Sequence, residues 1–221
     1  MLAILPKTRL NCIPIVTVLI FLMGCSSAYY GTMEKLGYHK RDLMVDRVEA
    51  AKDAQEDAKE QFKSALEQFS RVLKVDGGQL EDKYEQLKTA YDESNDRAET
   101  VRDRIESVED VSEALFDEWQ TELDQYSSDS LRRSSASKLK QTRRQYTQLI
   151  GAMKRAEKKM EPVLTAFHDQ VLFLKHNLNA KAIASLQTEL VSVEAEVNSL
   201  IRDMETSIKE ADAFISAMAK E

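Results

Sequence analysis

Apolar residues recur at alternating spacings of three and four along most of the chain, in four separate series. The series cover residues 44–72, 80–126, 139–174 and 183–218. A repeat of seven residues keeps one narrow seam of a helix against a partner helix, as in coiled-coil-like packing. The pattern therefore predicts four long helices, each with one buried seam.

Short polar or glycine-containing segments separate the four series, at Gly77-Gly78, at residues 127–130 and at residues 177–179. Paired glycines permit a tight reversal, and serine and aspartate side chains cap the free amides that open a helix. Short reversals place neighbouring helices antiparallel, and the second and third helices would each be roughly 70 Å long. We expect an all-α fold, an elongated antiparallel helical bundle of four long helices over residues 41–221.

Two features modify the simple seams. Pro162 lies inside the third series and predicts a kink rather than an end of the helix, and the stripe that follows it, including Leu172 and Phe173, is wide enough to meet more than one neighbour. Polar residues on the seams are candidates for control of helix register. They are Gln55, Ser94, Ser112 and Thr142.

The first series is shorter than the second, so the hairpin between the second and third helices is expected to protrude beyond the first helix. This hairpin carries Trp119, Tyr126 and Arg132. The sequence predicts a tip that contacts lipid headgroups or a protein partner.

Composition and charge agree with a helical protein. Six glycines, three prolines and 7% aromatic residues disfavour a many-stranded fold, and the net charge of −7 gives no reason to expect nucleic-acid binding. Residues 81–124 hold 16 acidic and 5 basic residues, whereas residues 130–159 hold 10 basic residues and one acidic residue. We expect the second and third helices to pair, with Arg132 and Arg133 near Asp124, and Arg143 and Arg144 near Glu109 and Asp110.

The first 24 residues have the pattern of a secretory signal, with Lys7 and Arg9 followed by the apolar run 13–23. Leu22-Met23-Gly24-Cys25 resembles a bacterial lipobox, which implies cleavage before Cys25 and acylation of its thiol. Acyl chains such as palmitate would anchor the protein to a membrane. We expect a signal peptide at 1–24, a lipid-anchored tether at 25–40 and, because Ser26 follows the cysteine, an outer-membrane location facing the periplasm.

We identify no catalytic residues, cofactor or metal site in the sequence. No phosphate-binding glycine-rich motif is present, and the cleavage would leave one acylated cysteine. His168 and His176 lie two helical turns apart, which leaves a metal-dependent sensor or enzyme as the alternative interpretation. The basic run 132–159 is either an anion-binding surface or a solvated face that the acidic second helix neutralises.

The lipobox, the tether and the segment from Pro162 through FHDQVLFLKHNLNAKAIASL (167–186) resemble proteobacterial coiled-coil lipoproteins that are grouped only as a domain of unknown function. The resemblance covers nearly the whole mature length and implies an envelope lipoprotein without transferable catalytic residues. We therefore expect a non-catalytic scaffold or adaptor that binds another cell-envelope component. A third interpretation is a homo-oligomer that forms through the apolar seams of the first or fourth helix.

Overall fold

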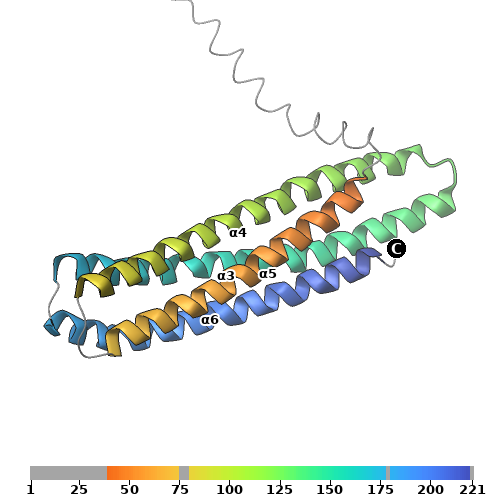
Figure 1. Ribbon diagram of the computed structural model, residues 1–221. Coiled ribbons are helices and arrows are strands. Elements are labelled where there is room, and N and C mark those ends of the chain that lie inside the picture. The colour runs from red at the N-terminus through yellow and green to blue at the C-terminus, as the bar shows by residue number, and fades with distance from the viewer. Residues whose placement is uncertain (1–38, 75–79, 178–179, 220–221) are drawn as a thin grey trace, which may run out of the picture. The chain divides into compact units, whose positions relative to one another are not determined.

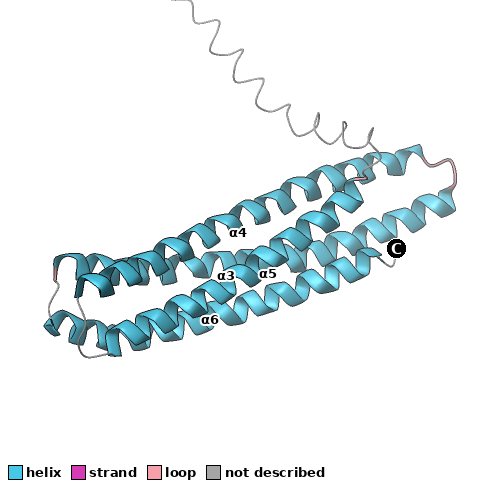
Figure 2. Cartoon of the chain, viewed as in Figure 1, coloured by secondary structure: helices cyan, strands magenta, loops and turns pink. Residues whose placement is uncertain are grey.

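The computed structural model describes residues 39–74, 80–177 and 180–219, and all long elements in these ranges are helices (Figures 1 and 2). They are α3 (Lys40–Lys74), α4 (Leu80–Glu122), α5 (Asp129–His176) and α6 (Ala180–Ala219), with a short 3₁₀ helix, η1 (Leu123–Gln125), after α4. The expected signal peptide, the tether with Cys25, and Gly77-Gly78 lie outside the described residues. The predicted all-α bundle of four long helices is confirmed.

Side-chain pairs between neighbouring helices establish that the helices alternate in direction. Gln61 of α3 donates a hydrogen bond to Glu93 of α4, and Asp57 of α3 pairs with Arg97 of α4. A step of four residues back along α3 therefore corresponds to a step of four residues forward along α4. Arg102 and Glu109 of α4 pair with Glu161 and Lys154 of α5 in the same reversed order. The remaining pairs close the bundle: Lys159 with Asp203 joins α5 to α6, and Lys52 with Asp212 joins α6 to α3.

The four apolar seams meet in a continuous core. Every predicted seam residue of α3 and α6 is buried, including Phe62, Phe69 and Phe214. Phe167 of α5 stacks on Phe69 at 4.4 Å and faces Phe62 at 6.5 Å between ring centroids, so the core also connects helices that lie diagonally across the bundle. Burial of such large side chains contributes about 1.5–3 kcal/mol each.

The polar seam residues are buried as well. Ser94, Ser112 and Thr142 each donate to a backbone carbonyl of their own helix, so their hydroxyl groups are satisfied locally. The amide of Gln55, in contrast, has no hydrogen-bond partner among the described residues although the side chain is fully buried. An unpaired buried amide costs about 1–3 kcal/mol, so Gln55 lowers the stability of the bundle relative to an apolar residue of similar size.

Some details of the predicted seams are wrong. The second helix ends at Glu122, and Tyr126 is exposed rather than part of the seam, whereas Phe116 and Leu123 are buried. The wide stripe after Pro162 is also only partly buried, because Leu172 and Phe173 are exposed.

The prediction that the third helix continues past Pro162 is confirmed, because α5 runs without interruption from Asp129 to His176. Ser128 caps its start by accepting a hydrogen bond from the Leu131 amide, so the predicted capping role of the 127–130 segment is confirmed. At the other end, the Asn177 side chain donates to the Phe173 carbonyl.

The ends of the helices are not level. Both helices rise by the same distance per residue, so the α3–α4 pairs can be extrapolated to the start of α3. Lys40 then lies opposite about residue 114 of α4. Continuing the α5–α6 register places the end of α6 opposite about residue 143 of α5. Residues 115–141, the end of the α4–α5 hairpin, therefore extend beyond α3 and α6 (Figure 1). We call this segment the tip, and it protrudes beyond the described residues of α3 and α6, as predicted.

Candidate binding surfaces: the tip and the α5–α6 groove

The tip has its own small core. Phe116, Leu123 and Leu139 are buried against one another, and Trp119 and Tyr146 pack around them. The Trp119 indole donates to the Ser135 hydroxyl at 2.8 Å, which ties α4 to α5. The two helices are therefore held together where α3 and α6 no longer cover them.

Arg143 completes the base of the tip. Its guanidinium lies 5.3 Å from the centroid of the Phe116 ring and donates to the Phe116 carbonyl at 3.2 Å. Arg143 and Glu109 line the same surface pocket, as expected, but Glu109 forms its ion pair with Lys154, at 2.8 Å. The prediction that α4 and α5 are neighbours is right. Arg132, expected near Asp124, pairs instead with Asp129 of its own helix at 2.9 Å.

The surface of the tip combines apolar and cationic side chains. Tyr126 is 41% exposed and Leu131 is 59% exposed. Arg133, Lys138, Lys140 and Arg144 are exposed and form no ion pair with the described residues. Direct ion pairs with α4 therefore do not involve these four residues, although Lys154 of the same basic run pairs with Glu109.

Two ionisable groups near the base of the tip are perturbed. Burial raises the pKa of the Tyr146 phenol, against a hydrogen bond with Ser112 that lowers it. The hydrogen bond with Glu109 raises the pKa of the Lys154 ammonium, which burial opposes. Both effects stabilise the protonated forms and fit a structural junction between α4 and α5.

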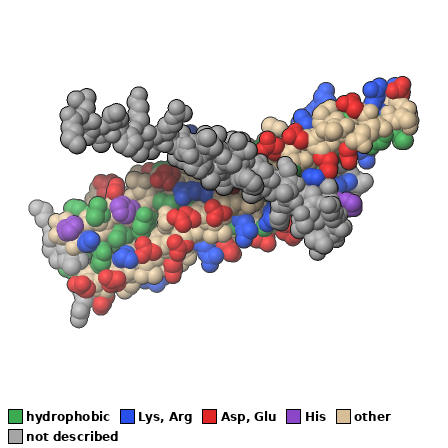
Figure 3. Space-filling model, turned by 90° about the horizontal axis from the view of Figure 1, so that it is seen from above, with side chains coloured by type: hydrophobic (Ala, Val, Ile, Leu, Met, Phe, Trp, Pro, Cys, Tyr) green, Lys and Arg blue, Asp and Glu red, His purple; other side chains and the backbone are tan. Residues whose placement is uncertain are grey.

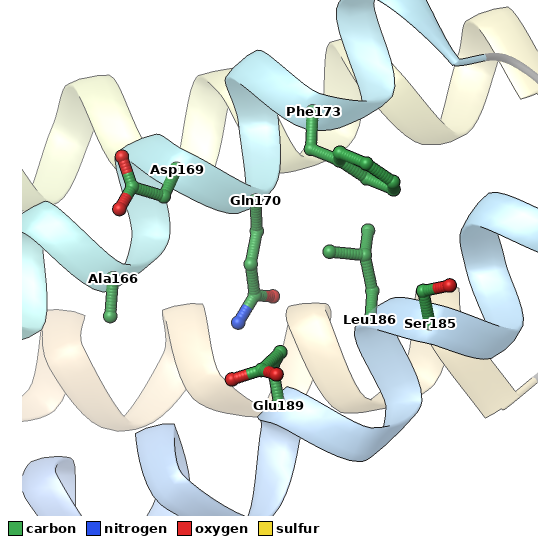
Figure 4. Close-up of a pocket in the computed structure, with 7 residues that line it drawn as sticks. All are labelled: Ala166, Asp169, Gln170, Phe173, Ser185, Leu186 and Glu189. Atoms are coloured by element: carbon green, nitrogen blue, oxygen red, sulfur yellow. The ribbon is translucent and has the colours of Figure 1, made fainter.

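A second surface is a groove of about 410 Å³ between α5 and α6 (Figure 4). Phe173 and Leu186 lie toward one end of the groove, and Asp169 lies toward the other (Figure 4). Glu189 and the amide of Gln170 lie between them. The complete lining is Ala166, Asp169, Gln170, Phe173, Ser185, Leu186 and Glu189.

Gln170 is the most informative residue of this groove. Its side chain is 4% exposed, and neither atom of its amide has a hydrogen-bond partner in the part of the chain that the structure describes. The sequence pattern contained a signal for it, because Gln170 stands three residues after Phe167 and four before Leu174, at a seam position that an apolar residue would otherwise occupy. The sequence analysis did not single it out.

Hydrophobic side chains also gather on the surface at the end of the bundle away from the tip, together with histidines (Figure 3). The exposed Leu172 and Phe173 belong to this end. Elsewhere on the face in view, acidic and basic side chains alternate (Figure 3).

The histidines of the alternative interpretation are both exposed on α5. The His168 ring lies 5.2 Å from the Tyr91 ring, and its Nδ1 is 4.0 Å from an oxygen of Asp169. Within residues 39–74, 80–177 and 180–219, no group of three or more histidine, cysteine, aspartate or glutamate side chains is arranged to hold a metal. No helix among these residues is long and apolar enough to cross a membrane.

The fold and these surfaces define an antiparallel four-helix bundle with a projecting two-helix tip. Comparison with protein families gives a match to the family described as "Protein of unknown function (DUF2959)" over residues 29–218. The chain belongs to this family. The search of curated proteins found no match. The search of solved structures found none either.

Proposed function

We propose that this protein is a non-catalytic, lipid-anchored scaffold or adaptor of the bacterial cell envelope, and that its tip binds another envelope component. The observation that carries the proposal is the tip itself. A two-helix segment held rigid by Phe116, Leu123 and Leu139 extends beyond the rest of the bundle and presents Tyr126 and Leu131 to solvent. Exposed aromatic and apolar side chains at a projecting point are typical of binding anchors.

The position of the proposed tether in the chain favours a lipid anchor at the end of the bundle that carries the tip. The α3 helix begins at Lys40, level with the base of the tip, and the proposed tether 25–40 is covalently continuous with it. Sixteen residues span at most about 55 Å when extended. Acylated Cys25 would thus hold the bundle near a membrane by its tip end. The resemblance to proteobacterial lipoproteins and Ser26 support an outer-membrane site facing the periplasm.

The first experiment tests the anchor. Labelling with radioactive palmitate and membrane fractionation are carried out on the natural chain and on Cys25→Ser. We expect label and membrane association only with the natural chain. Equal membrane association of Cys25→Ser would contradict the lipid-anchor part of the proposal.

The second experiment tests the tip. A photoreactive amino acid is introduced at Tyr126 or Leu131, and Val191, an apolar residue of α6 that is 70% exposed, provides the matched control. We expect the tip positions to capture a discrete envelope component that the control position does not capture. Capture of the same molecules from all three positions, or of none from the tip, would refute an adaptor tip.

A further inference from the structure

The outward face of α5 on its α6 side carries a stripe of residues seven apart. Residues at this spacing share one face in heptad packing. The stripe runs the length of the helix, and α6 leaves it uncovered at the tip. We call it the outer stripe, and it consists of Ser134, Gln141, Gln148, Arg155, Pro162 and Asp169.

The outer stripe is complementary to itself when two copies lie antiparallel. If Ser134 of one copy is level with Asp169 of the other, then Gln141 is level with Pro162 and Gln148 with Arg155. No two like charges of the stripe then oppose each other. The same register places Leu131 level with the exposed Leu172 and one residue from Phe173, so the exposed apolar residue of the tip meets the apolar end of the groove.

This register also brings groups of opposite charge together. Lys138, which forms no ion pair with the described residues, projects from the same side of the tip toward the carboxylates of Asp169 and Glu189. An apolar and a cationic group of the tip therefore lie opposite the apolar residues and the carboxylates of the groove.

Gly151 lies beside the outer stripe at the centre of this arrangement. A glycine inside a helix costs about 1 kcal/mol relative to alanine. Within the chain, a Cβ at this position would meet only the guanidinium of Arg155, at an ordinary contact distance of 3.6 Å. The bundle alone therefore does not require glycine here, whereas the close approach of a second helix does.

We propose that two copies of this chain associate through the α5–α6 face as an antiparallel two-fold dimer, with the tip of each copy in the groove of the other. The paired face runs from residue 131 to residue 173, roughly 63 Å of helix, which is long enough for an interface of ordinary size, about 1,200–2,000 Å². Arg144 of each copy lies within one residue of the level of Lys158 of the other at the rim, and these two exposed like-charge pairs limit the affinity.

Cysteine trapping tests the geometry in the full chain. Gly151→Cys lies next to the two-fold axis and is expected to form a disulfide-linked dimer under mild oxidation. Thr147→Cys is the matched control, because residue 147 is exposed on the same helix but lies on the α4 side. The unsubstituted chain measures any linkage through its own cysteines. Equal trapping through Thr147→Cys, or no trapping through Gly151→Cys, would overturn the proposed face.

Charge reversal tests the docking of the tip by sedimentation of the full chain in detergent. Lys138→Glu and Glu189→Lys are each expected to weaken the dimer at least about tenfold, since each change acts at both symmetric contacts. The two substitutions in one chain restore the opposite charges and should restore dimerisation. Unchanged association in either single variant, or no restoration in the double variant, would refute docking of the tip in the groove.

The inference does not depend on the lipid anchor or on a foreign partner. Failure of dimer trapping with continued capture of a different component from Tyr126 leaves the proposed function intact. Trapping of dimers without any foreign component at the tip confirms the dimer and contradicts the adaptor.

Discussion

Substitution of Phe116 by alanine should melt the tip while leaving the four-helix section folded. Removing a buried phenylalanine costs about 3–5 kcal/mol. Phe116 is 7% exposed and makes two further contacts, an edge-to-face contact with Tyr146 at 5.4 Å and the contact with Arg143. Such contacts are worth about 0.5–1.5 kcal/mol each. The tip core contains only three buried residues, so this loss is comparable with its local stability.

Hydrogen exchange followed by mass spectrometry distinguishes the two sections. In Phe116→Ala, amides of residues 115–141 should exchange at least a hundredfold faster, because about 3 kcal/mol corresponds to more than two factors of ten. Amides of α3 and of α6 around Phe214 should keep their protection. Tyr126→Ala, an exposed tip substitution, should leave exchange nearly unchanged. Equal acceleration throughout the bundle would show that the tip is not an independent unit and would refute the reasoning.

Three further outcomes follow from individual contacts. Gln170→Met should stabilise the monomer by about 1–2 kcal/mol in urea unfolding, because it removes an unpaired amide at nearly constant volume; a loss of stability would contradict this. A double-mutant cycle on Glu109 and Lys154 should give a coupling free energy of about 0.2–1 kcal/mol. Because folding raises the pKa of Lys154, this stabilisation is complete below the pKa of an unfolded lysine, near 10.4. It is lost as the pH rises through the pKa of Lys154 in the folded protein. Because the pKa of Tyr146 is also raised, the free energy of unfolding should fall as the pH rises above about 10, where an unfolded tyrosine ionises. Tyr146→Phe should make this fall smaller, and phenolate absorbance measured in the same titration reports the ionisation.

The heptad pattern predicted most of the buried core because helix packing depends on a local property. Residues such as Phe62, Phe167 and Met204 must lie on one side of their helices in any arrangement that buries the seams. The short connections between successive helices then restricted the bundle to a few topologies, because each connection places its two helices antiparallel. Gln55 could also be recognised as a buried polar residue, since it interrupts an otherwise apolar series.

The sequence was less informative where one helix extends beyond its neighbours along the bundle. Tyr126 continues the spacing of the second series but is exposed, because the helix ends at Glu122 and no third helix covers that level. Phe173 is exposed for a related reason, since it faces the border of α5 and α6 rather than the centre of the bundle. Periodicity identifies a face of a helix, but it does not say whether a neighbour reaches that face.

The sequence by itself determined the four helices, their alternating directions and the seams that hold them together, because each follows from spacing and from short connections. Only the tertiary structure decided that Glu109 pairs with Lys154, that Phe116 belongs to a separate core at the tip, and that Gln170 lies unpaired beside a groove. These features depend on the axial offset between helices, and that offset results from the packing of all four seams at once.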